Sequence, residues 1–93
     1  GFAGLLMTDD ISMQALSGNV ASRSAAAIAA GCDLVLHCNG DAEELAQVVA
    51  ASGQLSDAAL HRAEAALARR TAPQPVDLTA LHAERKALVA EGL

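Results

Sequence analysis

The chain has 93 residues, of which 53% are hydrophobic and only one is aromatic, and its formal net charge at pH 7 is −5. Nucleic-acid binding depends on cationic contacts with phosphates, so six Lys and Arg residues against eleven Asp and Glu residues argue against a nucleic-acid partner. No apolar run approaches the roughly 18 residues of a membrane-spanning helix, and no signal-peptide pattern is present, so we expect no membrane partner.

The first predicted element is a short apolar strand that ends in two adjacent carboxylates. An apolar run through Met7 is followed by Thr8, Asp9 and Asp10, a pattern typical of a strand buried on both faces. The C-terminal end of such a strand is where α/β barrels carry their catalytic groups. Because alternate strand residues share a face, only one carboxylate can point toward a barrel mouth. Asp9 is therefore a candidate catalytic residue, although a helix cap or a loop carboxylate fits the same spacing.

A helix and a second strand are predicted next. Asn19 is a suitable N-cap for an Ala-rich helix over residues 20–30, and Gly31 is the usual residue just beyond a helix end. Residues 32–38 read Cys-Asp-Leu-Val-Leu-His-Cys and form the second strand. Strand, helix and strand joined by short links make the βαβ unit of a parallel sheet. The predicted fold class is therefore α/β.

Three more helices are predicted after the second strand. Residues 41–44 have the spacing of a capping box, with Glu44 three positions after Asp41, and open a helix to about residue 52 that buries Leu45, Val48 and Val49. A longer helix runs from residue 56 or 57 to about residue 70. Two prolines at 73 and 75 interrupt the chain. An amphipathic helix then runs to about residue 91, and we expect it to pack on the domain surface.

The two cysteines, Cys32 and Cys38, lie six positions apart on one predicted strand. At about 3.3 Å per residue they are roughly 20 Å apart, whereas a disulfide requires Cα atoms within about 7 Å. We therefore expect free, buried thiols, which fit a reducing cytoplasm. The spacing of the Cys and His residues indicates no zinc site, and no other metal or cofactor is expected.

Two motifs in this order resemble glycoside hydrolase family 3. Residues 1–4 read Gly-Phe-Ala-Gly, residues 8–13 read Thr-Asp-Asp-Ile-Ser-Met, and residues 29–39 read Ala-Ala-Gly-Cys-Asp-Leu-Val-Leu-His-Cys-Asn. The resemblance is densest over residues 1–40 and weaker to about residue 70. Within the family it is to the bacterial β-N-acetylhexosaminidases of cell-wall recycling, because family β-glucosidases typically have Trp at the position of Asp10.

The resemblance implies roles for several residues. The first Asp of the motif is the family nucleophile, which assigns that role to Asp9. Asp10 is expected to be structural, either as a cap or as a partner of an Arg or a backbone N–H in the missing part of the protein. Met13 recurs in the family motif and is expected beneath the sugar, although a Met at this spacing is more often a core residue. His37 is expected to be structural, and Asn39 to contact the rim or to form a turn.

The resemblance also implies that this chain is one part of a longer enzyme. A (β/α)₈ barrel needs about 250 residues, so we expect residues 1–71 to form the last two βα units of a TIM barrel whose N-terminal part is missing. Residues 72–93 are expected to be a linker and a helix packed on that barrel. The family's acid/base is a His on a loop earlier in the chain, and it has no counterpart in residues 1–93. We therefore expect this chain alone to be inactive.

The implied function is that of a cytoplasmic, cofactor-independent, retaining β-N-acetylhexosaminidase. It would remove terminal β-linked N-acetylglucosamine from muropeptide fragments of peptidoglycan, with Asp9 as the nucleophile. Three alternatives remain open from the sequence. The first is a phosphorolytic member of the same family, the second is a non-catalytic βα binding or regulatory module, and the third is a truncated gene product without function.

Overall fold

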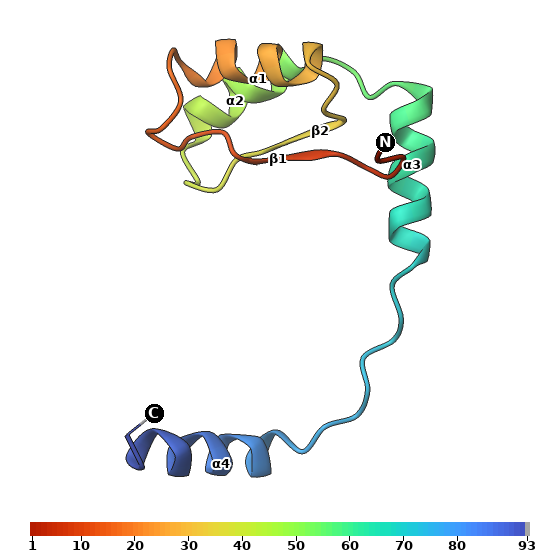
Figure 1. Ribbon diagram of the computed structural model, residues 1–93. Coiled ribbons are helices and arrows are strands. Elements are labelled where there is room, and N and C mark those ends of the chain that lie inside the picture. Colours follow the sequence, from red (N-terminus) through yellow and green to blue (C-terminus); the bar gives the residue numbers. More distant parts are fainter. Residues whose placement is uncertain (93) are drawn as a thin grey trace.

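The computed structural model describes residues 1–92. Its two strands and four helices follow one another in the order β1, α1, β2, α2, α3 and α4 (Figure 1). The bounds of these elements are Met7–Asp10 for β1, Val20–Ala29 for α1, Leu34–Leu36 for β2, Ala42–Ser52 for α2, Asp57–Ala68 for α3 and Leu78–Ala90 for α4. The strands pair in parallel and α1 connects them. The predicted α/β fold with a βαβ unit is confirmed.

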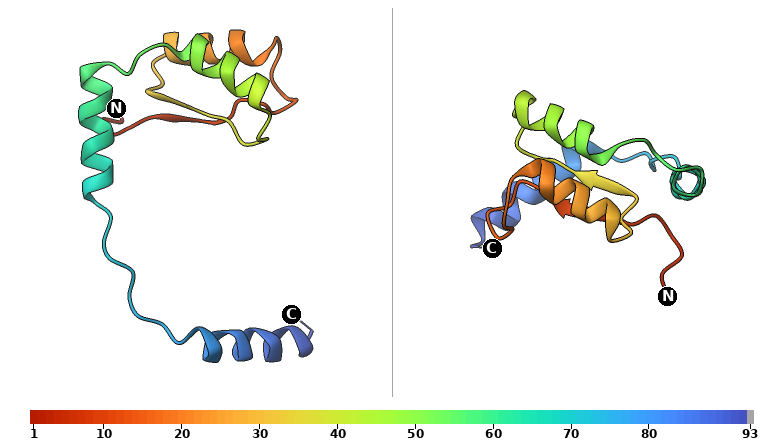
Figure 2. Two further views of the ribbon diagram at one scale, coloured as in Figure 1. Left: turned by 180° about the vertical axis from the view of Figure 1, so that it is seen from behind. Right: turned by 90° about the horizontal axis from the view of Figure 1, so that it is seen from above.

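Helices α1 and α2 cover one face of the two-stranded sheet, as Figures 1 and 2 show. The core between these layers consists of Ile11, Val20 and Val48, each at most 5% exposed, with Val35 packed against them. Ser24 is completely buried, and its hydroxyl donates to the carbonyl of Val20 at 2.6 Å. The buried hydroxyl of Ser24 therefore has its hydrogen-bond partner within its own helix, α1.

The opposite face of the sheet is open among the described residues. Met7 is 51% exposed and Asp9, on the same face, is also exposed, so the prediction of a strand buried on both faces is wrong for this structure, because no described element covers the second face. The accessible surface is 7223 Å², whereas a compact monomer of 9.4 kDa has about 5,000 Å². The chain therefore exposes considerably more surface than a compact monomer of the same mass.

Helix α2 shows the same lack of neighbours on its outer side. Of the three residues predicted to be buried there, only Val48 is, while Leu45 and Val49 are 47% and 65% exposed. The prediction for these two residues is wrong because α2 packs mainly on α1 and β2, which leaves its outer side exposed.

The predicted N-cap residues Asn19 and Asp41 are confirmed, but the capping box forms at α1 and not at α2, where it was predicted. Asn19 and Ser22 form a capping box at α1, in which the amide oxygen of Asn19 accepts from the backbone N–H of Ser22 at 2.8 Å. Asp41 caps α2, but the predicted capping box there is wrong. The N–H of Asp41 donates to the Asn39 side chain at 2.9 Å, and Glu44 is engaged by residues near the end of β2. Gly31 ends α1 with φ of 109°, a conformation that favours glycine.

The cysteines flank β2 instead of lying within it, because β2 is only three residues long. Both thiols are free, as predicted. Cys32 is half-buried and Cys38 is exposed, so the expectation that both are buried is wrong for Cys38.

Helix α3 is tied to the α/β unit by an ion pair. The Arg62 guanidinium donates two hydrogen bonds to the carboxylate of Asp33, one of them from Nε at 2.9 Å. Asp33 also accepts from the N–H of Leu6 at 3.0 Å, so one carboxylate joins α3, the start of β2 and the residue before β1. The hydrogen bond from Arg62 and the one from Leu6 lower the pKa of Asp33 from 3.8 to about 2.

This depressed pKa predicts an acid-sensitive contribution to stability. A carboxylate whose pKa is lower in the folded state stabilises that state fully above its unfolded pKa, and the contribution disappears as the pH falls through the folded pKa. Between about pH 4 and pH 2 we therefore expect the difference in unfolding temperature between the wild type and Asp33→Asn to shrink. Thermal unfolding across pH 2–6 checks this, and a difference that stays constant over that range would contradict it.

Helix α4 lies away from the α/β unit at the end of an extended segment (Figures 1 and 2). None of its residues is buried, and Leu78, Leu81 and Leu88 are 62%, 46% and 42% exposed. The radius of gyration is accordingly 18.9 Å, against about 12 Å for a compact chain of this length. The predicted packing of this helix is not seen within residues 1–92, and its packing on a complete barrel stays a prediction.

None of the helices in residues 1–92 combines the length and the apolar character that crossing a bilayer requires.

Candidate active site at the end of β1

The site begins with an irregularity in the pairing of the two strands. Met7 lies opposite Leu34 and Asp10 lies opposite Leu36, so β1 has one more residue than β2 over the same span. At this point the N–H of Leu36 donates to the side-chain hydroxyl of Thr8 at 3.0 Å. Such a bulge redirects side chains and is frequent beside active sites. The sequence analysis did not identify this role of Thr8, whose only signal is a hydroxyl on a β-branched residue directly before the carboxylates.

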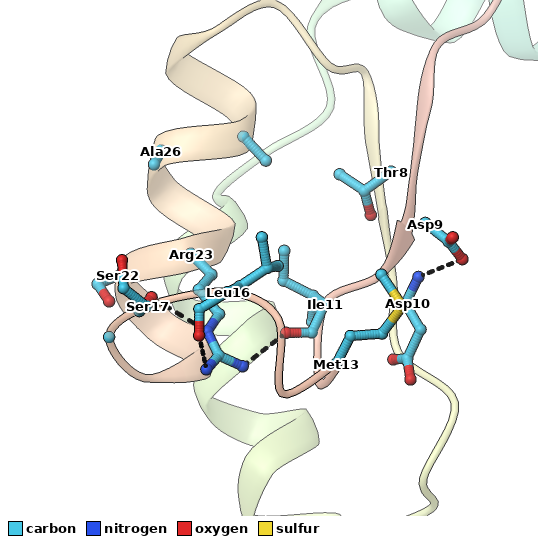
Figure 3. Close-up of a pocket in the computed structure, with 12 residues that line it drawn as sticks. Thr8, Asp9, Asp10, Ile11, Met13, Leu16, Ser17, Ser22, Arg23 and Ala26 are labelled. Atoms are coloured by element: carbon cyan, nitrogen blue, oxygen red, sulfur yellow. Dashed lines mark hydrogen bonds between the residues drawn. The ribbon is translucent and has the colours of Figure 1, made fainter.

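The side chains of β1 alternate between its two faces. Met7 and Asp9 are exposed, whereas Thr8 and Asp10 are half-buried. Figure 3 shows the Asp9 carboxylate pointing away from α1. Its Oδ1 atom accepts from the N–H of Asp10 at 2.8 Å. Since no other described residue donates to this carboxylate, Oδ2 is available to a ligand on the open side of the sheet.

Asp10 has the structural role that its position suggested. Its carboxylate accepts from the hydroxyl of Ser12 at 2.8 Å, from the N–H of Ser12 at 3.1 Å and from the N–H of Cys38 at 3.2 Å. The hydrogen bonds from Ser12 are the main reason that the pKa of Asp10 is lowered, while partial burial opposes the shift. Asp10 thereby fastens the turn after β1 to the residues after β2. The two adjacent carboxylates thus differ: that of Asp10 is held by hydrogen bonds, and that of Asp9 is accessible.

Residues 11–17 form an irregular loop between the carboxylates and α1. The N–H of Ile11 donates to the carbonyl of Leu36 at 2.8 Å. On its other side the loop is bound by Arg23, whose Nη1, Nη2 and Nε donate to the carbonyls of Ile11, Leu16 and Ser17 at 3.1, 2.7 and 3.2 Å (Figure 3). Arg23 was not predicted from the sequence. Its only signal was a single basic residue in an Ala- and Ser-rich helix, one turn after the helix start.

Met13 belongs to this loop and is 38% exposed. Figure 3 shows its side chain extending from the loop toward the end of β1, where the two carboxylates lie. The structure therefore brings Met13 close to the strand end that carries Asp9.

A cavity of about 660 Å³ lies between β1 and α1. Its lining includes Asp9 and Asp10 of β1, Met13 of the loop, and Arg23, Ala26 and Ala27 of α1. Asp9 borders the cavity, but its carboxylate points away from α1 (Figure 3). The surface that Asp9 faces is the open side of the sheet.

His37 is structural, as expected, and does not face a ligand. Its side chain is 4% exposed, and Nε2 lies 3.1 Å from a carboxylate oxygen of Glu44. The amide of Asn39 donates to the same oxygen. These two contacts, that from Asn39 foremost, lower the pKa of Glu44. His37 and Asn39 therefore fasten the end of β2 to α2, and Asn39 is part of this structural cluster.

The remaining histidines, His61 and His82, are exposed on helices α3 and α4. Among residues 1–92 no group of three His, Cys, Asp or Glu side chains comes together in a way that holds a metal ion.

Comparison with known proteins identifies a family that this chain matches. Residues 1–69 match the family model described as "Glycosyl hydrolase family 3 N terminal domain". A protein named Beta-hexosaminidase from Psychromonas ingrahamii is 54% identical over 41 residues, which cover 42% of this chain and 12% of the relative. Another of that name from Hydrogenovibrio crunogenus is 46% identical over 66 residues, covering 66% of this chain and 18% of the relative. No solved structure gives a significant match.

The chain thus spans between 12% and 18% of the length of these two relatives. The matched residues 1–69 include both strands, the carboxylate pair, the loop with Met13, and Arg23.

Proposed function

The chain belongs to glycosyl hydrolase family 3, and from this we propose that it carries the nucleophile of a retaining β-N-acetylhexosaminidase. The observation that carries the proposal is the contrast between the two adjacent carboxylates. Asp10 is occupied by three hydrogen-bond donors from Ser12 and Cys38, while Asp9 is exposed and receives only the N–H of Asp10. The names of the relatives support the class of sugar.

We propose that the active enzyme is a longer chain in which residues 1–71 are the last two βα units of a TIM barrel. The family domain is of the TIM-barrel type, and catalytic groups of such barrels lie at the C-terminal ends of the strands, the position that Asp9 has in β1. The open face of the sheet, which carries the exposed side chains of Met7 and Asp9, is the face that the interior of a complete barrel would enclose.

In the proposed mechanism Asp9 attacks the anomeric carbon of the sugar. The bond from that carbon to the leaving oxygen breaks, and an acid from another part of the enzyme protonates this oxygen. The same group then removes a proton from water, which attacks the anomeric carbon and releases the sugar from Asp9. The sugar keeps its β configuration because it is inverted twice. Met13, which extends toward the end of β1, is proposed to pack against the bound sugar.

The proposed substrate is terminal β-linked N-acetylglucosamine on muropeptide fragments of peptidoglycan, and the proposed compartment is the cytoplasm. The two free thiols at Cys32 and Cys38 are consistent with a reducing compartment, where disulfides are rare.

The test uses the longer protein with 4-nitrophenyl N-acetyl-β-D-glucosaminide, followed by proton NMR during the first turnovers. We expect the β anomer of free N-acetylglucosamine to appear first and then to mutarotate. Early appearance of the α anomer would contradict the nucleophile, and a folded protein without turnover would favour a binding module. The same reaction in phosphate buffer distinguishes hydrolysis from phosphorolysis, because only phosphorolysis yields a sugar phosphate.

A further inference from the structure

Arg23 is placed where it can control the geometry of the carboxylate end of β1. Its three guanidinium nitrogens reach three different carbonyls, those of Ile11, Leu16 and Ser17, and these carbonyls lie at the two ends of the loop of residues 11–17. A planar guanidinium presents its donors in a fixed fork, so binding to three carbonyls fixes their positions relative to one another. Arg23 therefore closes the loop at both ends from a single point on α1.

The start of the loop is held from two sides. The N–H of Ile11 is bound by the carbonyl of Leu36 at 2.8 Å, and its carbonyl is bound by Nη1 of Arg23 at 3.1 Å. Ile11 is 3% exposed and belongs to the core. Since Ile11 is the second residue after Asp9, these contacts restrict the path of the backbone directly after the carboxylate pair.

Apart from the hydrogen bonds that Ser12 donates to the Asp10 carboxylate, the rest of the loop has only local backbone contacts. The N–H of Met13 donates to the carbonyl of Asp10 at 3.2 Å, and the N–H of Leu16 donates to the carbonyl of Met13 at 3.3 Å. Both are local turn contacts that bind the loop to itself or to β1. The contacts from Arg23 at 2.7 to 3.2 Å instead bind it to α1, so they set where the loop, and Met13 within it, lies.

We propose that Arg23 is a positioning residue that holds the loop of residues 11–17, and with it Asp9 and Met13, in the arrangement that turnover requires. This rests on the proposed function, in which Asp9 attacks the sugar and Met13 packs against it. In this arrangement Arg23 acts without touching the sugar: it belongs to α1 and its guanidinium binds the loop carbonyls, while the Asp9 carboxylate points away from that helix (Figure 3). Its effect on catalysis passes through the backbone of the loop.

Arg62 is the matched control for this proposal. It is also a half-buried arginine on a helix that binds the α/β unit through more than one nitrogen, but its partner is Asp33, which bonds Leu6 before β1. Replacing Arg62 therefore removes a comparable tie from the opposite end of β1. A purely structural role of Arg23 predicts that the alanine variants of both arginines lose stability and keep their activity per folded molecule.

The experiment measures kcat and KM of the longer protein and of Arg23→Ala, Arg23→Lys and Arg62→Ala, each corrected for its folded fraction. We expect Arg23→Ala to lose about 10²-fold in kcat/KM, mostly in kcat, because small misplacements of a reacting group have effects of this size. Arg23→Lys should not restore the loss, because one ammonium cannot reproduce the fork. Arg62→Ala should keep the wild-type kcat/KM. Equal kcat/KM for Arg23→Ala and Arg62→Ala would overturn the proposal.

Hydrogen exchange of the peptide that covers residues 11–17 separates this inference from the proposed function. We expect faster exchange there in Arg23→Ala and unchanged exchange in Arg62→Ala. An inactive wild type would contradict the proposed function, and with it a role of Arg23 in turnover, while the exchange result would still decide whether Arg23 holds the loop. Unchanged exchange in Arg23→Ala would overturn that part as well.

Discussion

Replacement of Asp9 by Asn in the longer protein is expected to lower kcat by about 10⁴-fold or more, the scale seen when a residue of the catalytic machinery is removed. The amide cannot form the glycosyl-enzyme, because its oxygen is a much weaker nucleophile than a carboxylate oxygen. The fold should be retained. Asn has the same shape, and its oxygen can still accept from the N–H of Asp10, which is the one hydrogen bond that the carboxylate makes here. Steady-state kinetics together with thermal unfolding check both statements.

The neighbouring Asp10→Asn variant is the matched control. Asp10 accepts hydrogen bonds from the hydroxyl and N–H of Ser12 and from the N–H of Cys38, and an amide can accept at only one of its two positions. We expect a lower unfolding temperature and a kcat per folded molecule that falls far less than in Asp9→Asn, because Asp10 acts only through the backbone that it holds. The opposite pattern, with Asp10→Asn inactive and Asp9→Asn active, would exchange the roles of the two carboxylates and contradict the account.

The second large effect that we expect is that residues 1–93 alone have no turnover at all. A retaining glycosidase needs a second group to protonate the leaving oxygen, and residues 1–92 place no free candidate beside Asp9. His37 is buried against Glu44, and Asp10 is held by Ser12 and Cys38. We expect no release of 4-nitrophenol above background from its N-acetyl-β-D-glucosaminide, measured at the same molar concentration as the longer protein.

Co-expression with the remaining part of the barrel provides the control for that experiment. If the open face of the sheet is the surface that the other strands cover, the two parts should associate and regain activity. Turnover by residues 1–93 alone would contradict the account, because the acid/base would then have to lie within this chain.

The local elements could be predicted from the sequence because their signals are local. Asn19 marks the start of α1 and Gly31 marks its end, through side-chain and backbone preferences that need no distant partner. The place of Asp9 at the end of an apolar strand followed in the same way. What the sequence could not show was burial, since the exposure of Leu6, Leu45 and Val49 depends on which elements cover them.

The details of the site depend on contacts between residues far apart in the chain. Thr8 acts as an acceptor only because a bulge brings the N–H of Leu36 to its hydroxyl. Glu44 has the spacing of a capping box but binds His37 and Asn39, because these residues lie beside it once β2 and α2 pack together. No sequence motif marks Arg23, because the carbonyl groups that it binds lie 6 to 12 residues earlier in the chain and approach it only in the folded structure.

The most direct test of the central claim is to trap the glycosyl-enzyme of the longer protein with a fluorinated N-acetylglucosaminide and to map the label by peptide mass spectrometry. Fluorination slows hydrolysis of the intermediate, so that the sugar remains on the nucleophile. The account predicts one label per molecule, on Asp9 and absent from Asp9→Asn. A label on Asp10 or on any other residue, or a folded and active enzyme that carries no label, would contradict the assignment of Asp9 as the nucleophile.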